Sequence, residues 1–477
     1  MGPTLAIDQG TSGTKSVVVD ESGSILAIAE EAVRPKYLAG DGVEVDPEEL
    51  WQSVLVSGHR AVKEAGVPIS AVSLANQGET VLAWDHATGQ PLSAALVWQD
   101  GRSRTVTGRL EEHRHEIEAR SGLVLDPYFS APKMRWIREN WTTDGVVTTS
   151  DTWLLHRLSG EFVTDVSTAS RSLLLDIETT EWSNELLELF WLESEKLPRI
   201  VACDEVIGET SVFGESVPLC GLMVDQQAAL LAQACLVPGT AKCTYGTGAF
   251  LLANVGSDAV RSTAGLTTSV AWRMRDAVAY CVDGQVLTAA SAVRWLVDLG
   301  LIPDASALDS VSLPDAGGVL AVPTFVGAAA PWWRSDVTAS FHGLTLSTER
   351  GHVVRAVLEG IATQAAVLCR SVSADLGSDI DVLRVDGGLT QSSVLMQAQA
   401  DIGQVPVELY PNTHATALGA AAAARVSLDA GLTLEEAVGS WEPAQRYEPA
   451  WTADRATEHI ERWTRTLEAT MPDGGPR

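Results

Sequence analysis

The sequence has few basic residues for its length. Its 477 residues include 33 Lys and Arg against 62 Asp and Glu, which gives a formal net charge of −29. A surface this acidic repels polyanions, so we expect neither nucleic acid nor an anionic membrane as a partner. An anionic nucleotide would need local donors or a cation at its site to offset this charge.

Cysteine and long apolar runs are also scarce. The six cysteines form no Cys-x-x-Cys pair and have no histidines at zinc spacing, so we expect buried thiols in a reducing compartment. The longest apolar stretch, residues 319–333, is interrupted by Pro323, Gly327 and Pro331, which argues against a membrane helix. The first residues show no basic region and no signal-peptide pattern. We therefore expect a cytoplasmic protein with no membrane insertion.

Three common site motifs are absent. The sequence contains no Gly-x-x-x-x-Gly-Lys-Ser/Thr loop and no Gly-x-Gly-x-x-Gly that opens a helix after the first strand. It also contains no Gly-x-Ser-x-Gly elbow. These absences argue against a P-loop enzyme, a dinucleotide-binding enzyme and a serine hydrolase of the α/β type.

The sequence instead has an α/β pattern in which the same strand–turn–strand opening occurs twice. Residues 5–7 predict a strand, 9–14 a turn rich in Gly and Thr, and 16–19 a β-branched return strand. The same order recurs where residues 240–244 lead into Gly246-Thr247-Gly248 and the apolar run 250–255. A chain this long exceeds one compact core, so we expect two large domains that meet near residues 237–239.

Strands and helices alternate between these two hairpins. Asp46 and Pro47 predict the start of a helix, and residues 69–74 predict a strand that ends in the loop 76–79. Residues 382–385 predict another strand, followed by a helix over 392–399. This alternation favours a layered α/β fold. We expect the tail after Met471 to be disordered.

Asp225 stands between an apolar run and an alanine-rich segment, 228–234, that we expect to be helical. One interpretation is an ordinary helix N-cap. The other is a general base, held where it takes a proton from a substrate hydroxyl. The two Gly/Thr turns on either side favour the second interpretation, because together they suggest a phosphate site with a base beside it.

The two turns suit phosphoryl transfer, although the first could also be a plain β-turn. Turns rich in Gly and Thr let backbone N–H groups and hydroxyls approach phosphate oxygens closely. Lys15 adds a positive charge, and Asp8 could hold water on a magnesium ion, which prefers phosphate oxygens and one or two carboxylates. Phosphoryl transfer needs mainly positioning and charge neutralisation, so these parts would suffice.

Other polar and aromatic residues have two interpretations each. We expect Trp98 and Trp153 to be core aromatics, because tryptophan mostly serves as buried packing. Tyr128 either caps a core or faces a site. Glu79 is either a solvated surface acid or, because it follows a strand end beside Gly78, a group that faces a cleft.

Together these blocks resemble the FGGY carbohydrate kinases, among them the glycerol kinases most closely. The similarity extends from about residue 5 to residue 424. Its main blocks are Asp8-Gln9-Gly10-Thr11, Asn76-Gln77-Gly78-Glu79-Thr80, Trp98-Gln99-Asp100, Pro127-Tyr128-Phe129-Ser130-Ala131-Pro132-Lys133, Asp151-Thr152-Trp153-Leu154, Ala169-Ser170-Arg171, Asp225-Gln226-Gln227-Ala228-Ala229-Leu230, Thr244-Tyr245-Gly246-Thr247-Gly248, Pro331-Trp332-Trp333, Val385-Asp386-Gly387-Gly388 and Thr416-Ala417-Leu418-Gly419-Ala420-Ala421.

The resemblance implies an α/β fold of two actin-like, ribonuclease-H-like domains around a central cleft that closes on ATP and a small polyol or sugar. Residues 1–237 would form the N-terminal domain with the substrate site and the phosphate hairpin. Residues 238–430 would form the C-terminal, nucleotide-binding domain, and 431–477 a helical segment with the tail. Members of the family often form dimers or tetramers, so a homo-oligomer is a further expectation.

The same resemblance implies roles for individual residues. Asp225 matches the catalytic base and, together with Asp8, the magnesium site. The implied substrate contacts are Gly78, Glu79, Tyr128, Asp225, Gln226 and Phe250. The implied ATP contacts are Thr11, Ser12, Gly13, Lys15, Gly246, Thr247, Ala290, Arg294, Gly388 and Ser392.

Four positions depart from the glycerol kinase pattern. Ala290, Arg294 and Ser392 replace the usual Gly, Gln and Asn beside the nucleotide. Gly78 replaces an Arg that would aim donors at substrate hydroxyls, and losing one charged hydrogen bond costs about 1.5–3 kcal/mol unless another group replaces it.

A glycine at position 78 also leaves room for a larger substrate. We therefore expect either glycerol-like phosphorylation or a kinase for a tetritol, pentitol, xylulose or ribulose. A non-catalytic ATP-binding relative is a third hypothesis, against which the intact Asp8 and Asp225 argue.

Overall fold

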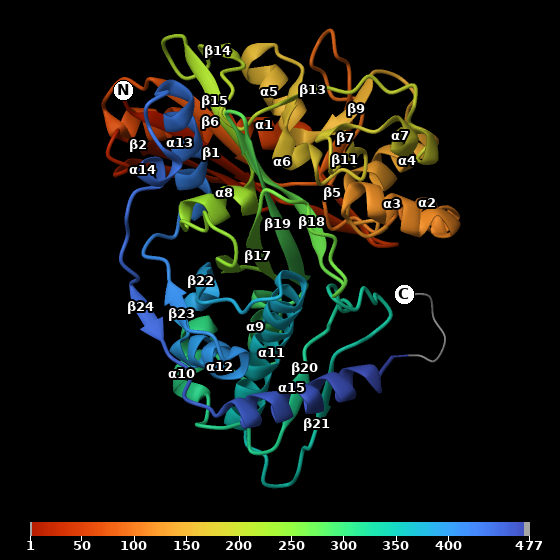
Figure 1. The fold of residues 1–477 in the computed structure, drawn as a ribbon, viewed down its shortest axis with the longest axis vertical. Helices are drawn as coiled ribbons and strands as arrows, with labels where there is room; N and C mark the ends of the chain where they lie inside the picture. The colour runs from red at the N-terminus through yellow and green to blue at the C-terminus, as the bar shows by residue number, and fades with distance from the viewer. Residues whose placement is uncertain (1, 472–477) are drawn as a thin grey trace.

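The computed structural model describes residues 2–471 and contains two large sheets, one in each half of the chain (Figure 1). Both sheets are mixed, with parallel strands at the centre and antiparallel hairpins at the edge. In spatial order, the first consists of β14 (Gly208–Thr210), β15 (Val217–Val224), β6 (Ala71–Asn76), β1 (Thr4–Gly10), β2 (Gly13–Val19) and β3 (Ile25–Ala32). The second consists of β18 (Thr267–Met274), β19 (Ala277–Val286), β17 (Ala249–Gly256), β16 (Ala241–Tyr245), β22 (Leu383–Asp386), β23 (Val407–Leu409) and β24 (Gln445–Tyr447).

The two sheets have the same connections at their centres. β1 pairs antiparallel with β2 and parallel with β6, while β16 pairs antiparallel with β17 and parallel with β22. The predicted α/β class and the repeated opening are therefore confirmed. The first turn is tighter than predicted, because pairing continues to Gly10 and Gly13 and leaves only Thr11 and Ser12 at the tip.

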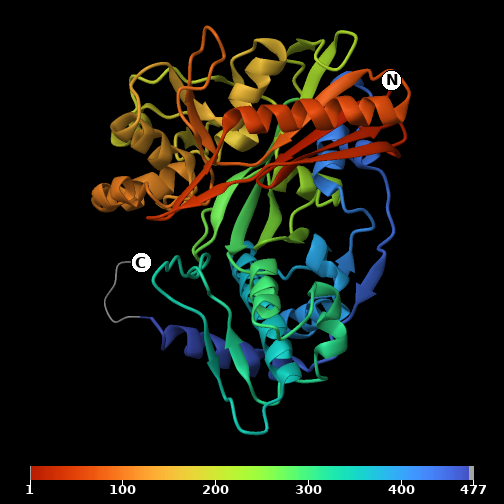
Figure 2. The same cartoon turned by 180° about the vertical axis from the view of Figure 1, so that it is seen from behind.

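The outer face of the first sheet is covered by α1 (Pro47–Ala65) (Figure 2). The helix begins as the sequence predicts: Asp46 caps it by accepting a hydrogen bond from the Glu48 N–H at 2.9 Å, and Pro47 is its first residue. Its apolar side, including Leu50, packs on strand residues such as Leu5. This layer holds β1, and with it the first Gly/Thr turn, in place.

The other face of the first sheet carries a helix from late in the chain. α13 (Ala415–Leu428) packs on β1, β6 and β15 and against α8 (Asp225–Ala232) (Figure 1). The approach to α8 requires a glycine, because a Cβ at Gly419 would lie 1.9 Å from the Ala228 carbonyl oxygen. The predicted domain limits stay a prediction, and α13 shows that residues of the range 238–430 lie on the first sheet.

The second sheet is covered by α11 (Arg350–Leu376), on which α12 (Ser393–Gly403) and α15 (Ala453–Glu468) pack. α11 is long and apolar enough to cross a membrane, yet 83% of its most apolar 18-residue window is buried inside the protein. It is a core helix of the C-terminal half. The predicted helix over 392–399 is confirmed as α12, which Ser392 caps. The predicted disordered tail, residues 472–477, lies outside the described residues.

The remaining elements are shorter and surround the first sheet and the loops of the second. A five-stranded sheet contains, in spatial order, β4 (Lys36–Leu38), β5 (Gly42–Val45), β8 (Ala95–Leu96), β7 (Val81–Trp84) and β9 (Val146–Thr149). Two-stranded ladders pair β10 (Val163–Asp165) with β13 (Arg199–Val201), β11 (Leu175–Asp176) with β12 (Glu181–Trp182) and β20 (Leu320–Val322) with β21 (Ser340–His342). The other helices are α2 (Arg104–Arg109), α3 (Arg114–Ser121), α4 (Ser130–Asn140), α5 (Ser150–Ser159), α6 (Val166–Ala169), α7 (Asn184–Leu189), α9 (Ala290–Asp298), α10 (Leu308–Val311) and α14 (Leu434–Val438). All six cysteines are buried free thiols, as predicted.

Candidate active site

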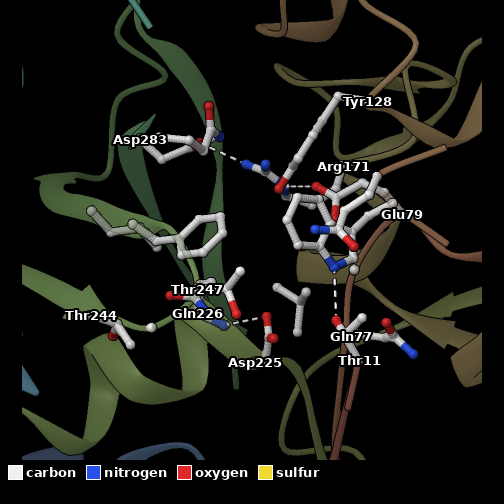
Figure 3. Close-up of a pocket in the computed structure, with 18 of the residues that line it drawn as sticks. Thr11, Gln77, Glu79, Tyr128, Arg171, Asp225, Gln226, Thr244, Thr247 and Asp283 are labelled. Atoms are coloured by element: carbon white, nitrogen blue, oxygen red, sulfur yellow. Dashed lines mark hydrogen bonds and ion pairs between the residues drawn. The ribbon is translucent and has the colours of Figure 1, made fainter. Parts of the chain in front are cut away.

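A cavity of about 270 Å³ lies between the two halves (Figure 3). Its walls combine the two hairpin turns, the loop after β6, the start of α8 and the ends of β17 and β19. All six predicted substrate residues and four predicted ATP residues line it together: Thr11, Ser12, Gly78, Glu79, Tyr128, Asp225, Gln226, Gly246, Thr247 and Phe250. Segments far apart in the sequence thus meet at one site.

Asp225 is the first residue of α8, directly after β15. The N-cap is Val224, so the interpretation of Asp225 as an N-cap is wrong. Its carboxylate accepts a hydrogen bond from the Gln226 N–H at 2.7 Å and faces the cavity (Figure 3). Burial raises the pKa of Asp225 to about 7, and repulsion by Asp8 and Glu79 adds to the shift. A carboxyl group that titrates near neutral pH suits a general base.

Glu79 is a buried residue and not a solvated acid. Its side chain is 5% exposed, and its backbone takes the left-handed conformation with φ 58°. Few residues other than glycine adopt this conformation, which is often found at functional sites. The Arg171 Nε donates to Glu79 Oε1 at 2.6 Å. Burial raises the pKa of Glu79, although Arg171 opposes the shift.

Arg171 links the two halves of the cavity wall. Besides Glu79 it donates, through Nη1, to Asp283 Oδ1 on β19 at 2.7 Å (Figure 3). Burial lowers the pKa of Arg171, but the two carboxylates outweigh it and hold that pKa well above its usual range. Sequence reasoning gave no role to either residue. The block Ala169-Ser170-Arg171 was a weak signal for the arginine, and no motif pointed to Asp283.

Tyr128 is positioned by a buried lysine. Lys133 Nζ donates to the carbonyl oxygens of Pro127 at 2.9 Å, Phe129 at 2.8 Å and Tyr128 itself. Burial lowers the pKa of Lys133 to about 8. The lysine therefore fixes the loop that brings the Tyr128 ring to the cavity, which favours the interpretation of Tyr128 as a site residue.

Trp98 and Trp153 differ in their surroundings. Trp153 is fully buried in the core, as predicted. Trp98 instead lines the cavity, and its indole Nε1 donates to Thr11 Oγ1 at 2.8 Å. Its ring also meets Tyr128 and Phe250, with centroids 5.6 and 5.9 Å apart. Trp98 packs against the core of the first half and also lines the cavity, so the expectation of a core aromatic is met only in part.

A second buried lysine lies behind the cavity wall. Lys242 Nζ donates to Gln226 Oε1 and, at 2.9 Å, to Thr244 Oγ1. Thr244 in turn donates to Asp386 Oδ1 at 2.6 Å. Burial lowers the pKa of Lys242, and Asp386 and Asp225 are among the anionic groups that oppose the shift. Sequence reasoning missed Lys242.

Asp8 does not line the cavity, but it interacts electrostatically with other carboxylates. Burial raises its pKa to about 6, Lys15 opposes the shift, and Glu30 and Asp386 add to it. Asp8 likewise raises the pKa of Asp225. Carboxylates that repel one another in this way are neutralised by a divalent cation, and magnesium takes one or two carboxylates with phosphate oxygens. The donor set therefore fits magnesium, although no group of three or more His, Cys, Asp and Glu side chains occurs within residues 2–471.

The other predicted ATP residues lie outside the set that lines the cavity. Gly13 closes the first hairpin opposite Gly10, and Lys15, with 38% of its side chain exposed, pairs with Glu30 at 3.3 Å. Ala290 begins α9 and donates its N–H to the Gly246 carbonyl at 3.0 Å.

The last three predicted ATP residues lie on the same half of the molecule. Arg294 is exposed on α9, and Gly388 is exposed after β22. Ser392 caps α12 and donates to Asp309 Oδ1 at 2.5 Å. Contacts of these residues with ATP stay predictions.

A duplicated fold, two Gly/Thr turns at a shared cavity and a partly buried carboxylate between them are the parts that a two-domain kinase needs. The family assignment follows from comparison with known proteins. Residues 4–232 match the N-terminal domain, and residues 241–428 the C-terminal domain, of the FGGY family of carbohydrate kinases. The chain belongs to this family and is a carbohydrate kinase.

Relatives along the whole chain share this organisation. The chain is 37% identical to glycerol kinase 2 of Thermotoga maritima, over 98% of both chains, and 40% identical to a glycerol kinase of Alkalilimnicola ehrlichii, over 95% of this chain and all of the relative. The structure of Plasmodium falciparum glycerol kinase with ADP superposes with a TM-score of 0.91 at 32% identity, over 99% of each chain. A xylulose kinase from Lactobacillus acidophilus, 19% identical with a TM-score of 0.87 over 98% of each chain, shares the fold. The two-domain, actin-like fold is thereby confirmed, as is the similarity to glycerol kinases.

Proposed function

We propose that the chain transfers the terminal phosphoryl group of ATP to a primary hydroxyl of a small polyol, with Asp225 as the general base. Asp225 carries the proposal, because its pKa of about 7 and its place between the two turns suit it to accept a proton near neutral pH. The relatives named glycerol kinase support a polyol of glycerol type as the acceptor. The ADP in the Plasmodium structure supports an adenine nucleotide as the donor.

In this reaction one bond forms and one breaks at phosphorus. The substrate oxygen bonds to the terminal phosphorus while the bond from phosphorus to the leaving ADP oxygen breaks. The hydroxyl proton passes to Asp225, which needs to be ionised beforehand. Glu79, Tyr128 and Gln226 would hold the other hydroxyls, and the Phe250 ring would cover the carbon chain.

The backbone of the two turns would position the phosphates. Thr11 and Ser12 approach from the first half, and Gly246 and Thr247 from the second. Magnesium, which Asp8 and Asp225 would hold, supplies neutralisation of phosphate charge. Closing of the two halves would exclude water, which otherwise competes with the substrate as acceptor.

The test is ADP release by the purified protein with ATP and magnesium. The panel contains glycerol, erythritol, threitol, xylitol, ribitol, arabinitol, xylulose and ribulose, with a no-acceptor control. We expect ADP release that depends on one or more acceptors. Equal release without an acceptor would indicate a simple ATPase, and no release with any acceptor would refute the proposal. A cytoplasmic location and a homo-oligomer stay predictions.

A further inference from the structure

The space beside Gly78 is partly filled by a neighbour. A Cβ at Gly78 would lie 2.9 Å from Val224 Cγ2, and both residues line the cavity. A methyl group thus stands where a side chain at position 78 would begin. Gly78 therefore gives the cavity an apolar wall there, and any widening for a longer substrate has to lie on another side.

The opposite wall carries a buried polar group with an unused acceptor. Gln285 on β19 is 3% exposed, and its Nε2 donates to Asp283 Oδ2 at 2.8 Å. Its Oε1 is buried and has no hydrogen-bond partner within residues 2–471. Leaving a buried acceptor without a partner is costly, so this oxygen calls for a partner such as a water molecule or a bound ligand.

The orientation of this amide is fixed by its neighbours. A carboxylate paired with an arginine can only accept hydrogen bonds, so Asp283 faces the amide nitrogen of Gln285. Arg171 holds the other oxygen of Asp283 at 2.7 Å, and Arg171 is itself bound to Glu79. The chain of contacts from Glu79 to Gln285 leaves Oε1 as the free acceptor.

Gln285 also lies where the cavity has room to extend. It borders both the cavity that contains Asp225 and a second, adjoining cavity of about 670 Å³. The two cavities also share four other lining residues, which are Tyr37, Trp98, Gln99 and Tyr128. A substrate whose reacting end is at Asp225 can therefore continue toward Gln285 and the larger space.

We propose that Gln285 Oε1 accepts a hydrogen bond from a substrate hydroxyl beyond the three of glycerol, which makes it a specificity-determining residue for polyols or ketoses of four or five carbons. This inference rests on the proposed function. In the proposed function the three hydroxyls of glycerol would already have partners in Asp225, Glu79, Tyr128 and Gln226, which all line the cavity. Gln285 adds one acceptor, on the side of the cavity that is open to a longer chain.

The test compares the wild type with Gln285→Met, which keeps the length of the side chain and removes both the Oε1 acceptor and the Nε2 donor to Asp283. We expect kcat/KM for the preferred four- or five-carbon substrate to fall about 10-fold, and kcat/KM for glycerol to change less than about 3-fold. Structural damage would lower both values together. Equal loss for both substrates, or glycerol as the preferred wild-type substrate, would overturn the inference.

Binding gives a second readout that does not depend on transfer. Calorimetry with a non-hydrolysable ATP analogue present measures Kd for glycerol and for each longer acceptor. We expect the wild type to bind a longer acceptor more tightly than glycerol, and Gln285→Met to lose about 10-fold for that acceptor. Such binding without ADP release would refute the proposed function and support this inference, whereas no preference for a longer acceptor would refute the inference.

Discussion

The two halves of the molecule repeat one sheet but place their lysines differently. In the first half Lys15 lies on β2 with 38% of its side chain exposed, and pairs with Glu30. In the second half Lys242 on β16 is fully buried and bonds to Gln226 and Thr244. Solvent therefore screens the charge of Lys15, whereas the charge of Lys242 acts in a low-dielectric environment.

This difference indicates a division of work between the halves. The first half contributes Asp8, Glu79 and Asp225, three carboxylates whose pKa values burial raises. The second half contributes Lys242, a buried cation that lowers the pKa of Asp225, whereas the cations that lower the pKa values of Asp8 and Glu79 belong to the first half. Similar topology thus positions a base on one side and a charge that stabilises its ionised form on the other.

The largest effect is expected when the base itself is removed. Asp225→Asn keeps the size and the hydrogen bond to the Gln226 N–H but cannot take the substrate proton. We expect kcat to fall about 10³-fold or more, while the variant still folds and still binds ATP. Rapid-quench turnover and calorimetry with ATP measure the two quantities. Full turnover by the variant would remove Asp225 from the mechanism.

A matched pair of lysine variants tests the comparison between the halves directly. Lys242→Met removes a buried cation that lowers the pKa of Asp225, so we expect the kcat/KM profile to shift to higher pH and kcat/KM at pH 7 to fall about 10- to 100-fold. Lys15→Met should leave the pH midpoint unchanged and alter mainly KM for ATP. Equal shifts of the midpoint in both variants would contradict the division of work.

The pH dependence of the wild type gives a smaller, graded effect. Because the folded-state pKa of Asp225 is raised to about 7, the group is protonated and inactive as a base below that pH. We therefore expect kcat/KM to rise about 10-fold per pH unit below the midpoint and to level off above it. Steady-state rates from pH 5.5 to 8.5 measure this profile, and a flat profile over that range would exclude Asp225 as the titrating base.

The smallest effect concerns the link between the first turn and the substrate wall. Trp98→Phe removes the Nε1 donor to Thr11, and we expect kcat/KM to fall about 2- to 10-fold. Trp153→Phe is the control, because its Nε1 donates to the Gly89 carbonyl in the core at 2.9 Å. The control should lower the free energy of unfolding by about 0.5–1.5 kcal/mol and leave the kinetics unchanged. Denaturant titration and steady-state rates separate the two outcomes.

The sequence by itself determined the parts of the site that lie in contiguous motifs. Both hairpins, the cap of α1, the helix α12 and the place of Asp225 at the start of a helix follow from local patterns, because turn and cap chemistry acts over a few residues. The family resemblance points to four further residues, and the structure brings all of them to the same cavity: Glu79, Tyr128, Gln226 and Phe250. The contacts of these motifs with one another were expected only through the resemblance.

Only the tertiary structure decided which isolated residues join the site. One cavity wall contains Arg171, Asp283 and Gln285, because Arg171, which follows α6, pairs with Asp283 on β19. Lys242 reaches Gln226 because β16 packs against α8. Burial then sets their chemistry, since it forces Arg171 into ion pairs and raises the pKa of Asp225. A single sequence shows neither the register that brings such residues together nor the loss of water that makes their charges strong.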